Sequence, residues 1–262
     1  MDLSLKGKRA LVAGSTQGIG KAAAIEIAEL GASVTLIARN EEKLKQVLKL
    51  LPSSGAQKHD YIVADFTRPE EMRRRVISYL SRGAVFHILM NNTGGPPGGR
   101  AIDADISAYQ LAFSNHLLCN HILAQVCVPG MREAGYGRII NIISTSVKQP
   151  LPSLGVSNTI RGAVANWAKT LANELGEFNI TVNNVLPGAT QTSRLDGIVS
   201  NKSNQTGLSI DEVLKRMSDA VPMKRVAQPK EIGAAVAFLA SPAASYINGI
   251  NLPVDGGRTG SL

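Results

Sequence analysis

The chain has 262 residues, is 44% hydrophobic and carries a formal net charge of +8 at pH 7. This length provides one large open-sheet domain with a buried core and is a tight fit for two unrelated domains. No run approaches the roughly 18 consecutive apolar residues of a membrane span, and the basic residues are scattered, with residues 73–75 the longest contiguous run. Neither a membrane nor a nucleic acid is therefore expected as a partner.

The two cysteines indicate the redox setting. Cys119 and Cys127 lie in one stretch with a helical pattern, which is a poor arrangement for a disulfide. Nothing in the sequence resembles a metal-ligand cluster. We therefore expect no bound metal and a reducing, cytoplasmic location.

Apolar runs and helical patterns alternate from one end of the chain to the other, which is typical of parallel strands joined by helical crossovers. The runs are mostly apolar on both faces, as strands covered by helices on both sides must be. The sequence therefore predicts a single-domain α/β fold, a doubly wound (Rossmann) seven-stranded parallel sheet with helices on both faces. The expected strands span residues 9–13, 33–38, 58–64, 85–90, 138–143, 180–185 and 250–254.

Between these strands, apolar residues recur at helical spacing. One segment after the sixth strand differs, because residues 189–221 are polar and rich in Ser, Asn and Gly before a short helical pattern at 209–220. We expect this segment to be irregular and to form a mobile lid over the substrate. The expected helices span residues 18–30, 41–50, 69–81, a long part of 102–131, 157–175 and 229–239.

A glycine-rich turn directly follows the first strand, with a G-x-x-x-G-x-G spacing where the strand passes into a helix. Glycine suits this place because the backbone must turn tightly and approach a pyrophosphate closely, while free N–H groups at the start of the helix face the phosphates. A glycine-rich turn without a ligand is the alternative. The candidate phosphate-binding residues are Gly14, Ser15, Thr16, Gln17, Gly18, Ile19 and Gly20.

This spacing resembles that of the short-chain dehydrogenase/reductase family, of the classical type, and the resemblance runs from about Leu5 to Gly257. Among family members, the 3-oxoacyl carrier-protein reductases are the closest functional counterpart. The resemblance implies an oxidoreductase that binds a dinucleotide. Further stretches match in the family's order, namely Asp65, residues 91–94, Asn115, Ser144, residues 183–188, and residues 248–249 with 254–257.

The resemblance also implies places around the dinucleotide. Asp65 and Phe66 would lie near the adenine, and Asn92 would brace the central strands. The chain departs from the family at Ala13, where a threonine is usual, and at residues 95–99, which extend a loop and would shape the substrate mouth. The other residues expected along the cofactor are Thr93, which replaces the usual alanine, Gly94, and, around the nicotinamide, Pro187, Gly188, Thr190 and Thr192.

The end of the second strand indicates the choice of cofactor. An acidic side chain at this place favours the ribose diol of NAD, whereas an arginine favours the phosphate of NADP. Here the strand ends Ala38-Arg39-Asn40, and the guanidinium of Arg39 can donate a forked pair of hydrogen bonds to a phosphate. NADP(H) is therefore the preferred cofactor, with NAD(H) and a merely solvated Arg39 as the alternatives.

Members of the family use an asparagine, a serine, a tyrosine and a lysine four positions after the tyrosine. By this resemblance Asn115 would hold a water chain, and Ser144 would hydrogen-bond the substrate oxygen. Counting the family's usual thirteen residues from Ser144 leads to Ser157, and four further to Arg161, so both the tyrosine and the lysine are missing. The candidate catalytic set is therefore Asn115, Ser144, Ser157 and Arg161.

An aliphatic hydroxyl and a guanidinium donate hydrogen bonds but do not readily relay a proton. Hydride transfer belongs to the cofactor, and an ordered water touching Ser144, Ser157 and Arg161 could supply the proton. Alternatively, Ser157 is a helix N-cap and Arg161 is solvated. His116 is expected to be structural, because the side chain after Asn115 on a helix points about 100° away.

Two functions remain open at this point. The leading hypothesis is an NADP(H)-dependent oxidoreductase that reduces a ketone or oxidises a secondary alcohol of small size. The alternative is an NADP(H)-binding protein with little or no turnover, acting as a regulator or oligomer partner. A homo-oligomer, a tetramer or a dimer, is expected from the resemblance through residues 157–175 and 250–254. Arg194 and Lys224, in and after the lid, are either solvated or attract an acidic tail of the substrate.

Overall fold

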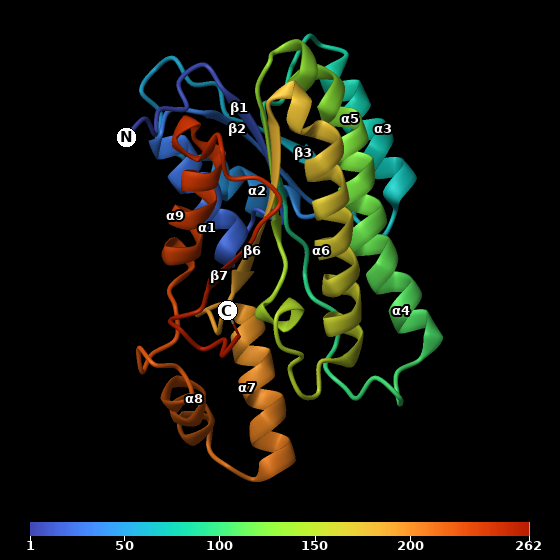
Figure 1. The fold of residues 1–262 in the computed structure, drawn as a ribbon, viewed down its shortest axis with the longest axis vertical. Helices are drawn as coiled ribbons and strands as arrows, with labels where there is room; N and C mark the ends of the chain where they lie inside the picture. Colours follow the sequence, from blue (N-terminus) through green and yellow to red (C-terminus); the bar gives the residue numbers. More distant parts are fainter. Residues whose placement is uncertain (262) are drawn as a thin grey trace.

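The computed structural model describes residues 1–261 and contains one sheet of seven parallel strands, in the order β3-β2-β1-β4-β5-β6-β7 (Figure 1). The expected doubly wound parallel sheet is therefore confirmed. β2 and β3 lie on one side of β1, and β4 to β7 lie on the other. The strand order therefore reverses between β1 and β4, and sheets of this kind bind ligands in the crevice at the carboxyl ends of such a strand pair. The strands are β1 (Arg9–Ala13), β2 (Ser33–Ala38), β3 (Asp60–Val63), β4 (Ile88–Asn91), β5 (Gly137–Ile142), β6 (Ile180–Pro187) and β7 (Asn251–Val254).

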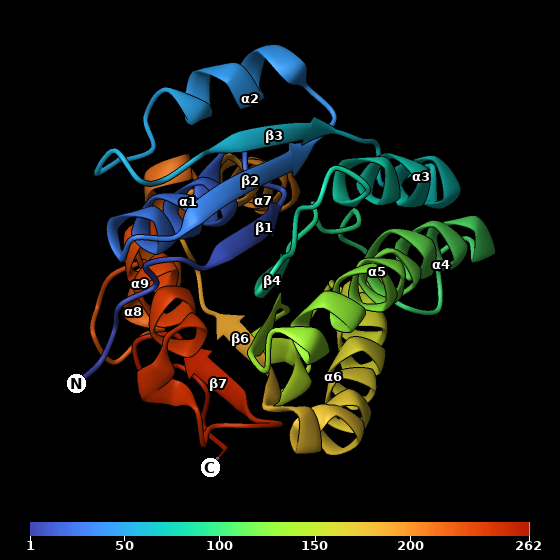
Figure 2. The same ribbon diagram turned by 90° about the horizontal axis from the view of Figure 1, so that it is seen from above.

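Helices cover both faces of the sheet (Figure 2). One face of the sheet is covered by α1, α2 and α9, and the other face by α3, α5 and α6. α1 and α9 approach closely because small residues meet there: a Cβ on Gly233 would lie 3.0 Å from the backbone of Ala22. The helices are α1 (Gly18–Glu29), α2 (Glu41–Leu48), α3 (Pro69–Leu80), α4 (Ile106–Phe113), α5 (Cys119–Glu133), α6 (Gly155–Leu175), α7 (Ser193–Thr206), α8 (Ile210–Asp219) and α9 (Pro229–Ala240).

The long helical stretch Ile106–Glu133 joins α4 and α5 through a π-helical turn at Ser114–Leu118. By length and composition it is the one helix within the described residues that could cross a membrane. Its buried side chains, among them Cys119, Leu123 and Met131, pack in the core against the sheet. The core helix of a soluble protein passes the same test of length and composition. Cys119 and Cys127 are both buried and free, as expected.

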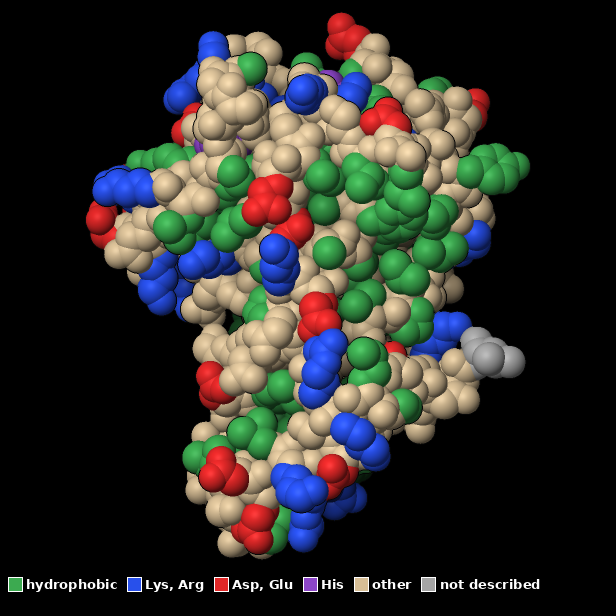
Figure 3. All heavy atoms as spheres, turned by 90° about the vertical axis from the view of Figure 1, so that its left-hand side faces the viewer, with side chains coloured by type: hydrophobic (Ala, Val, Ile, Leu, Met, Phe, Trp, Pro, Cys, Tyr) green, Lys and Arg blue, Asp and Glu red, His purple; other side chains and the backbone are tan. Residues whose placement is uncertain are grey.

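The segment 189–221 is more regular than expected. It forms two helices, and α7 was missed because only Leu195 and Val199 of its residues are buried. These two side chains pack against Val213 of α8, so the helix is stabilised by a partner that follows it in the chain. Both helices project beyond the carboxyl ends of the strands (Figure 1), and on the face seen in Figure 3 they carry Lys, Arg, Asp and Glu side chains intermixed.

Four asparagines form a ladder across neighbouring strands. Asn91, Asn141, Asn184 and Asn251 occupy paired positions in β4, β5, β6 and β7. Each amide nitrogen donates to the oxygen of the next side chain, at 2.8, 2.9 and 2.8 Å. Because buried amides need partners, the ladder fixes the relative register of these strands close to where the loops of the site begin.

Candidate active site

Gly14 and Gly20 meet so closely in the turn after β1 that no side chain fits between them. A Cβ on Gly20 would lie 2.1 Å from the carbonyl oxygen of Gly14, and one on Gly14 would lie 2.6 Å from the carbonyl oxygen of Asn92. Gly14 and Gly18 also have φ angles of 60° and 53°, which L side chains rarely adopt. The Asn92 Nδ2 donates to the Gly14 carbonyl at 3.3 Å, so the end of β4 supports the turn.

The start of α1 has no side-chain cap. Gln17, at the N-cap position, makes no capping bond, and its Nε2 instead donates to Ser193 Oγ at 3.0 Å. Ser15 is fully buried, and its Oγ has no partner within residues 1–261. Thr16 and Ile19 are half-buried in the same turn. Uncapped N–H groups beside a buried hydroxyl suit an anionic group, so these residues fit the pyrophosphate of a dinucleotide.

Asp65 and Arg39 lie near each other after β3 and β2. The backbone N–H of Thr67 donates to Asp65 Oδ1 at 2.9 Å, and this bond does most to hold the pKa of Asp65 below its ordinary value. The positive charges of Arg39 and Arg68 lower that pKa further. Phe66 packs against the core on the α5 side of the sheet. The structure thus brings together the residues expected at the adenine end.

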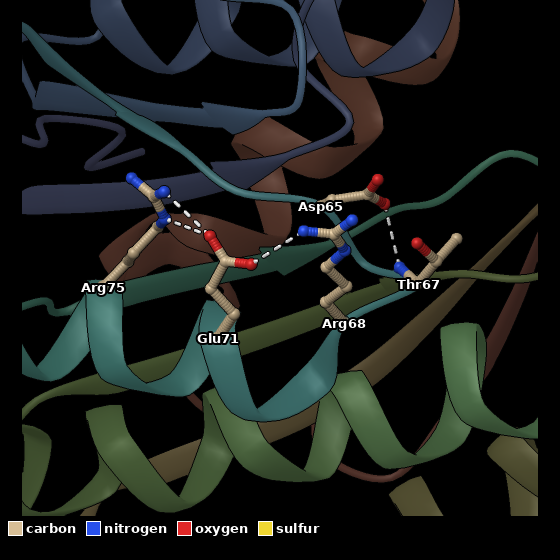
Figure 4. Close-up of polar contacts among 5 residues, drawn as sticks. All are labelled: Asp65, Thr67, Arg68, Glu71 and Arg75. Carbon is tan, nitrogen blue, oxygen red and sulfur yellow. Dashed lines mark hydrogen bonds and ion pairs between the residues drawn. The ribbon is translucent and has the colours of Figure 1, made fainter.

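Arg39 differs from Arg68 and Arg75 in that it forms no ion pair within the described residues. Glu71 engages both Arg75, at 2.8 Å, and Arg68, at 3.5 Å (Figure 4). Arg39 is exposed and forms no ion pair with any described residue. Its guanidinium is therefore available to a phosphate at the end of β2, whereas the guanidinium of Arg75 is already occupied.

The expected nicotinamide end runs from the end of β6 to the start of α7. Gly188 lies against Asp255, where a Cβ would approach within 2.8 Å. Thr190 Oγ1 donates to the Gly188 carbonyl at 3.0 Å, and Thr192 accepts the N–H of Leu195 and caps α7. These bonds fix the backbone between Pro187 and α7. They also place Thr192 beside Gly18, because a Cβ on Gly18 would lie 3.0 Å from its methyl group.

Ser144 and Arg161 both lie at the carboxyl end of β5. Ser144 accepts the N–H of Ser146 at 3.1 Å, and Arg161 reaches across from α6, where its Nη1 donates to the Ile142 carbonyl at 2.8 Å. Arg161 is only 8% exposed, so the expectation of a solvated side chain is wrong. Burial, with the charge of Arg194 as a smaller cause, lowers the pKa of Arg161 to about 10.

Ser157 is not the N-cap of its helix. α6 begins at Gly155 after Leu154, which places Ser157 in the first turn, half-buried and on the same helix as Arg161. The helix begins earlier than expected because the Gly155 N–H donates to the Gly99 carbonyl at 2.9 Å, which ties the start of α6 to the loop after β4. The alternative explanation of Ser157 as a cap is therefore wrong.

Asn115 and His116 lie in the π-helical turn. The Oδ1 of Asn115 is buried and has no partner within the described chain, so this acceptor is free to bind a donor. His116 is buried and shares a hydrogen bond between its Nδ1 and Thr93 Oγ1. It therefore faces the loop after β4. The expectation that it points away from the site assumed an α-helix, in which the geometry differs from that of a π-helical turn.

The surroundings of His116 keep its ring neutral. Its pKa is lowered to about 2, mainly by burial and to a smaller extent by the positive charges of Arg161 and Arg194. His116 thus lies near both arginines. Arg194 is not simply a solvated lid residue either, because its Nη2 donates to the Pro96 carbonyl at 2.6 Å. Lys224, by contrast, is exposed and donates to the Asp219 carbonyl at 2.8 Å.

Comparisons with known proteins agree with this geometry. A family model described as enoyl-(acyl carrier protein) reductase matches residues 13–259. The chain belongs to the short-chain dehydrogenase/reductase family of oxidoreductases. The 7alpha-hydroxysteroid dehydrogenase of Escherichia coli K12 is 30% identical to it over 100% of this chain and 98% of that one.

Another relative and a solved structure have a similar level of sequence identity to this chain. A chloroplastic tropinone reductase homologue of Arabidopsis thaliana is 34% identical over 98% of this short-chain dehydrogenase/reductase and 77% of its own chain. The structure of L-sorbose reductase from Gluconobacter frateurii, complexed with NADPH and L-sorbose, superposes with a TM-score of 0.93 at 32% identity and covers 100% of both chains.

The sequence analysis missed two features of this site. The asparagine ladder left a signal, because an asparagine occurs at or near the ends of four expected strands. The contact between Arg194 and Pro96 left none, because these residues lie 98 positions apart and only the fold brings the lid against the extended loop.

Proposed function

We propose that this short-chain dehydrogenase/reductase is an NADP(H)-dependent enzyme that reduces a small ketone or oxidises a secondary alcohol with an atypical catalytic set. The observation that carries the proposal is the anchoring of Arg161 on the Ile142 carbonyl, two residues before Ser144. This contact supports the proposal, because it holds a buried cation at the end of the strand that leads to the Ser144 hydroxyl. Its relatives with this fold are oxidoreductases.

The residues at the adenine end support NADP(H) over NAD(H). Arg39 lies at the tip of β2 without an acidic partner, and no carboxylate stands at that tip to bind a ribose diol. The solved L-sorbose reductase carries NADPH. The turn from Gly14 to Gly20, with the buried Ser15 hydroxyl, would hold the pyrophosphate. Pro187, Gly188, Thr190 and Thr192 would border the nicotinamide, and Asp65, Phe66, Asn92, Thr93 and Gly94 would line the remainder of the cofactor.

The chain's own groups divide the remaining work. Ser144 would donate a hydrogen bond to the substrate oxygen and orient the carbonyl. The charge of Arg161, held in a dry environment, would stabilise the negative charge that develops on that oxygen. When bound, the reduced nicotinamide supplies a hydride. The proton would come from water ordered by Ser144, Ser157 and Arg161, with Asn115 as a further acceptor for a water chain.

The test is consumption of NADPH in the presence of a panel of ketones, diketones and oxo acids. We expect substrate-dependent consumption that falls in Ser144→Ala, since the loss of one hydrogen bond to the transition state costs about 10²-fold or more. The conservative Ser157→Thr variant, which keeps a hydroxyl, serves as the control and should retain most of the activity.

The second candidate function is an NADP(H)-binding protein with little turnover. It is favoured by Ser157 and Arg161, which stand where the family's proton-donating pair would stand. Binding of NADPH that Arg39→Ala weakens, together with no consumption by any carbonyl, would establish this function in place of the first.

We also propose that the chain forms a homo-oligomer. Large apolar side chains just before α4, along it and in the π-helical turn stay exposed, with Ile102 and Ile106 81% and 76% accessible. Exposed apolar side chains gathered on one segment are typical of an interface. Light scattering after size-exclusion chromatography distinguishes a dimer or tetramer from a monomer. A cytoplasmic location stays a prediction from the sequence.

A further inference from the structure

Two arginines stand beside the proposed reaction centre without an acidic partner. Arg161 and Arg194 form no ion pair with any residue between 1 and 261, whereas Arg68, Arg75, Arg100 and Arg225 each pair with a Glu or Asp on the surface. Arg161 makes one hydrogen bond, to the Ile142 carbonyl, and its guanidinium has further N–H donors. Arg194 likewise donates to a single carbonyl, that of Pro96.

The proximity of these two cations is costly without a counterion. The cost falls on Arg161, which is 8% exposed and whose pKa is lowered further by the charge of Arg194, whereas Arg194 itself is exposed. A buried charge is normally paired, because its desolvation costs several kcal/mol that only a nearby opposite charge offsets. The neighbouring titratable group, His116, is held neutral and provides no negative charge. The site therefore has an excess of positive charge that an anionic ligand would complement.

The extended loop after β4 holds this arrangement in place. A Cβ on Gly95 would lie 3.4 Å from Arg194 Nη2, so the guanidinium rests directly on the loop. The other end of the loop is joined to the start of α6, where the Gly99 N–H donates to the Ser153 carbonyl at 2.8 Å. Residues 95–99 thus connect the lid arginine to the helix that carries Arg161. The loop of residues 95–99 would therefore serve to hold the guanidinium of Arg194 in place.

We propose that Arg194, together with Arg161, binds the carboxylate of a small oxo acid whose carbonyl is reduced at Ser144. The inference rests on the proposed function and specifies its substrate class. Arginine forks match carboxylates in geometry, and two of them can hold one carboxylate from two sides. In the reaction the carbonyl carbon would gain a hydride from NADPH and the oxygen a proton taken from the solvent through the ordered water, which gives a hydroxy acid and NADP⁺.

The position of Arg161 indicates that the anion lies close to the reacting carbonyl. Its guanidinium is anchored two residues before Ser144, so a carboxylate that it contacts is separated from the carbonyl by few bonds. The phosphate of a carrier-bound thioester is separated from its carbonyl by the whole thioester arm. A free 2-oxo or 3-oxo acid therefore fits the pair better than a carrier-protein substrate does.

The kinetic test compares short 2-oxo and 3-oxo acids with the methyl esters of the same acids. In the wild-type protein we expect kcat/KM for the acids to exceed that for the esters about tenfold or more. Arg194→Gln should lower kcat/KM for the acids by about 10- to 100-fold, the range of a lost charged hydrogen bond, and change that for the esters by less than about twofold. Arg216→Gln, which removes an exposed positive charge of the same lid, is the matched control and should leave the preference for acids intact.

A binding measurement separates this proposal from the proposed function. Calorimetry with succinate, an unreactive dicarboxylate, and protein saturated with NADP⁺ should show binding that Arg194→Gln abolishes and Arg216→Gln preserves. If carbonyls are reduced but acids and esters react equally, the anion site is wrong and the reductase stands. If nothing is reduced but succinate binds through Arg194, the reductase is wrong and the anion site stands. If Arg194→Gln raises the dissociation constant of NADPH by the same factor as it lowers kcat/KM for the acids, the arginine belongs to the cofactor site and the proposal is overturned.

Discussion

Replacement of His116 by asparagine tests the electrostatics of the site. The ring is buried, hydrogen-bonded to Thr93 and close to Arg161 and Arg194. The side chain of asparagine places a polar atom near the position of Nδ1, so His116→Asn can keep the bond to Thr93 while it removes the titratable group. The variant therefore isolates the free energy that comes from the protonation of the ring.

The size of the effect follows from the shift in pKa. Burial lowers the pKa of His116 from 6.5 to about 2 in the folded chain, so below pH 6.5 the unfolded chain binds a proton that the folded chain does not. Stability is then present above pH 6.5 and falls by up to about 1.4 kcal/mol per pH unit as the pH decreases. Between pH 6.5 and 4.5 the wild-type protein should lose roughly 2 kcal/mol more than His116→Asn does.

Urea denaturation followed by circular dichroism at a series of pH values measures this difference directly. All other ionisable groups are the same in the two proteins, so their contributions cancel in the comparison. Parallel stability curves between pH 6.5 and 4.5 would show that His116 protonates freely in the folded state, and the inferred neutral state of this buried ring beside two arginines would be refuted. A limb of the kcat/KM profile near pH 6.5 that disappears in the variant would refute it equally.

Other predictions concern the ladder, the glycine turn and the cofactor. Asn141→Leu leaves two ladder partners unpaired and should lower the free energy of unfolding by about 2–4 kcal/mol, measured by urea denaturation. Gly20→Ala places a Cβ 2.1 Å from the Gly14 carbonyl and should abolish NADPH binding, whereas Gly94→Ala has open space and should change stability by less than about 0.5 kcal/mol; thermal unfolding with and without NADPH compares them. Arg39→Glu should raise the dissociation constant of NADPH about 10- to 100-fold and that of NADH far less. Fluorescence titration measures both constants, and an equal rise for the two cofactors would contradict the role given to Arg39.

The sequence by itself determined the fold and the cofactor turn. The expected strands 9–13 and 33–38 coincide with β1 and β2, because short runs of apolar, β-branched residues form buried strands in any parallel sheet. The turn from Gly14 to Gly20 was also predictable, since the requirement for glycine there is local: the close approach of Gly20 to Gly14 joins residues six positions apart. Local physical constraints of this kind are visible in the order of residues.

Tertiary structure alone decided the charge distribution of the site. Whether Arg161 is solvated or buried depends on α6 packing against β6, from where the side chain reaches the end of β5, and the helical pattern of α6 gives no information on that contact. α7 has few apolar residues and exists as a helix because α8 packs against it. Arg194 is placed on Pro96 only when the lid meets the loop after β4. Burial and charge–charge proximity depend on segments distant in the chain, and for this reason the anionic character of the inferred substrate emerges from the fold and not from any motif.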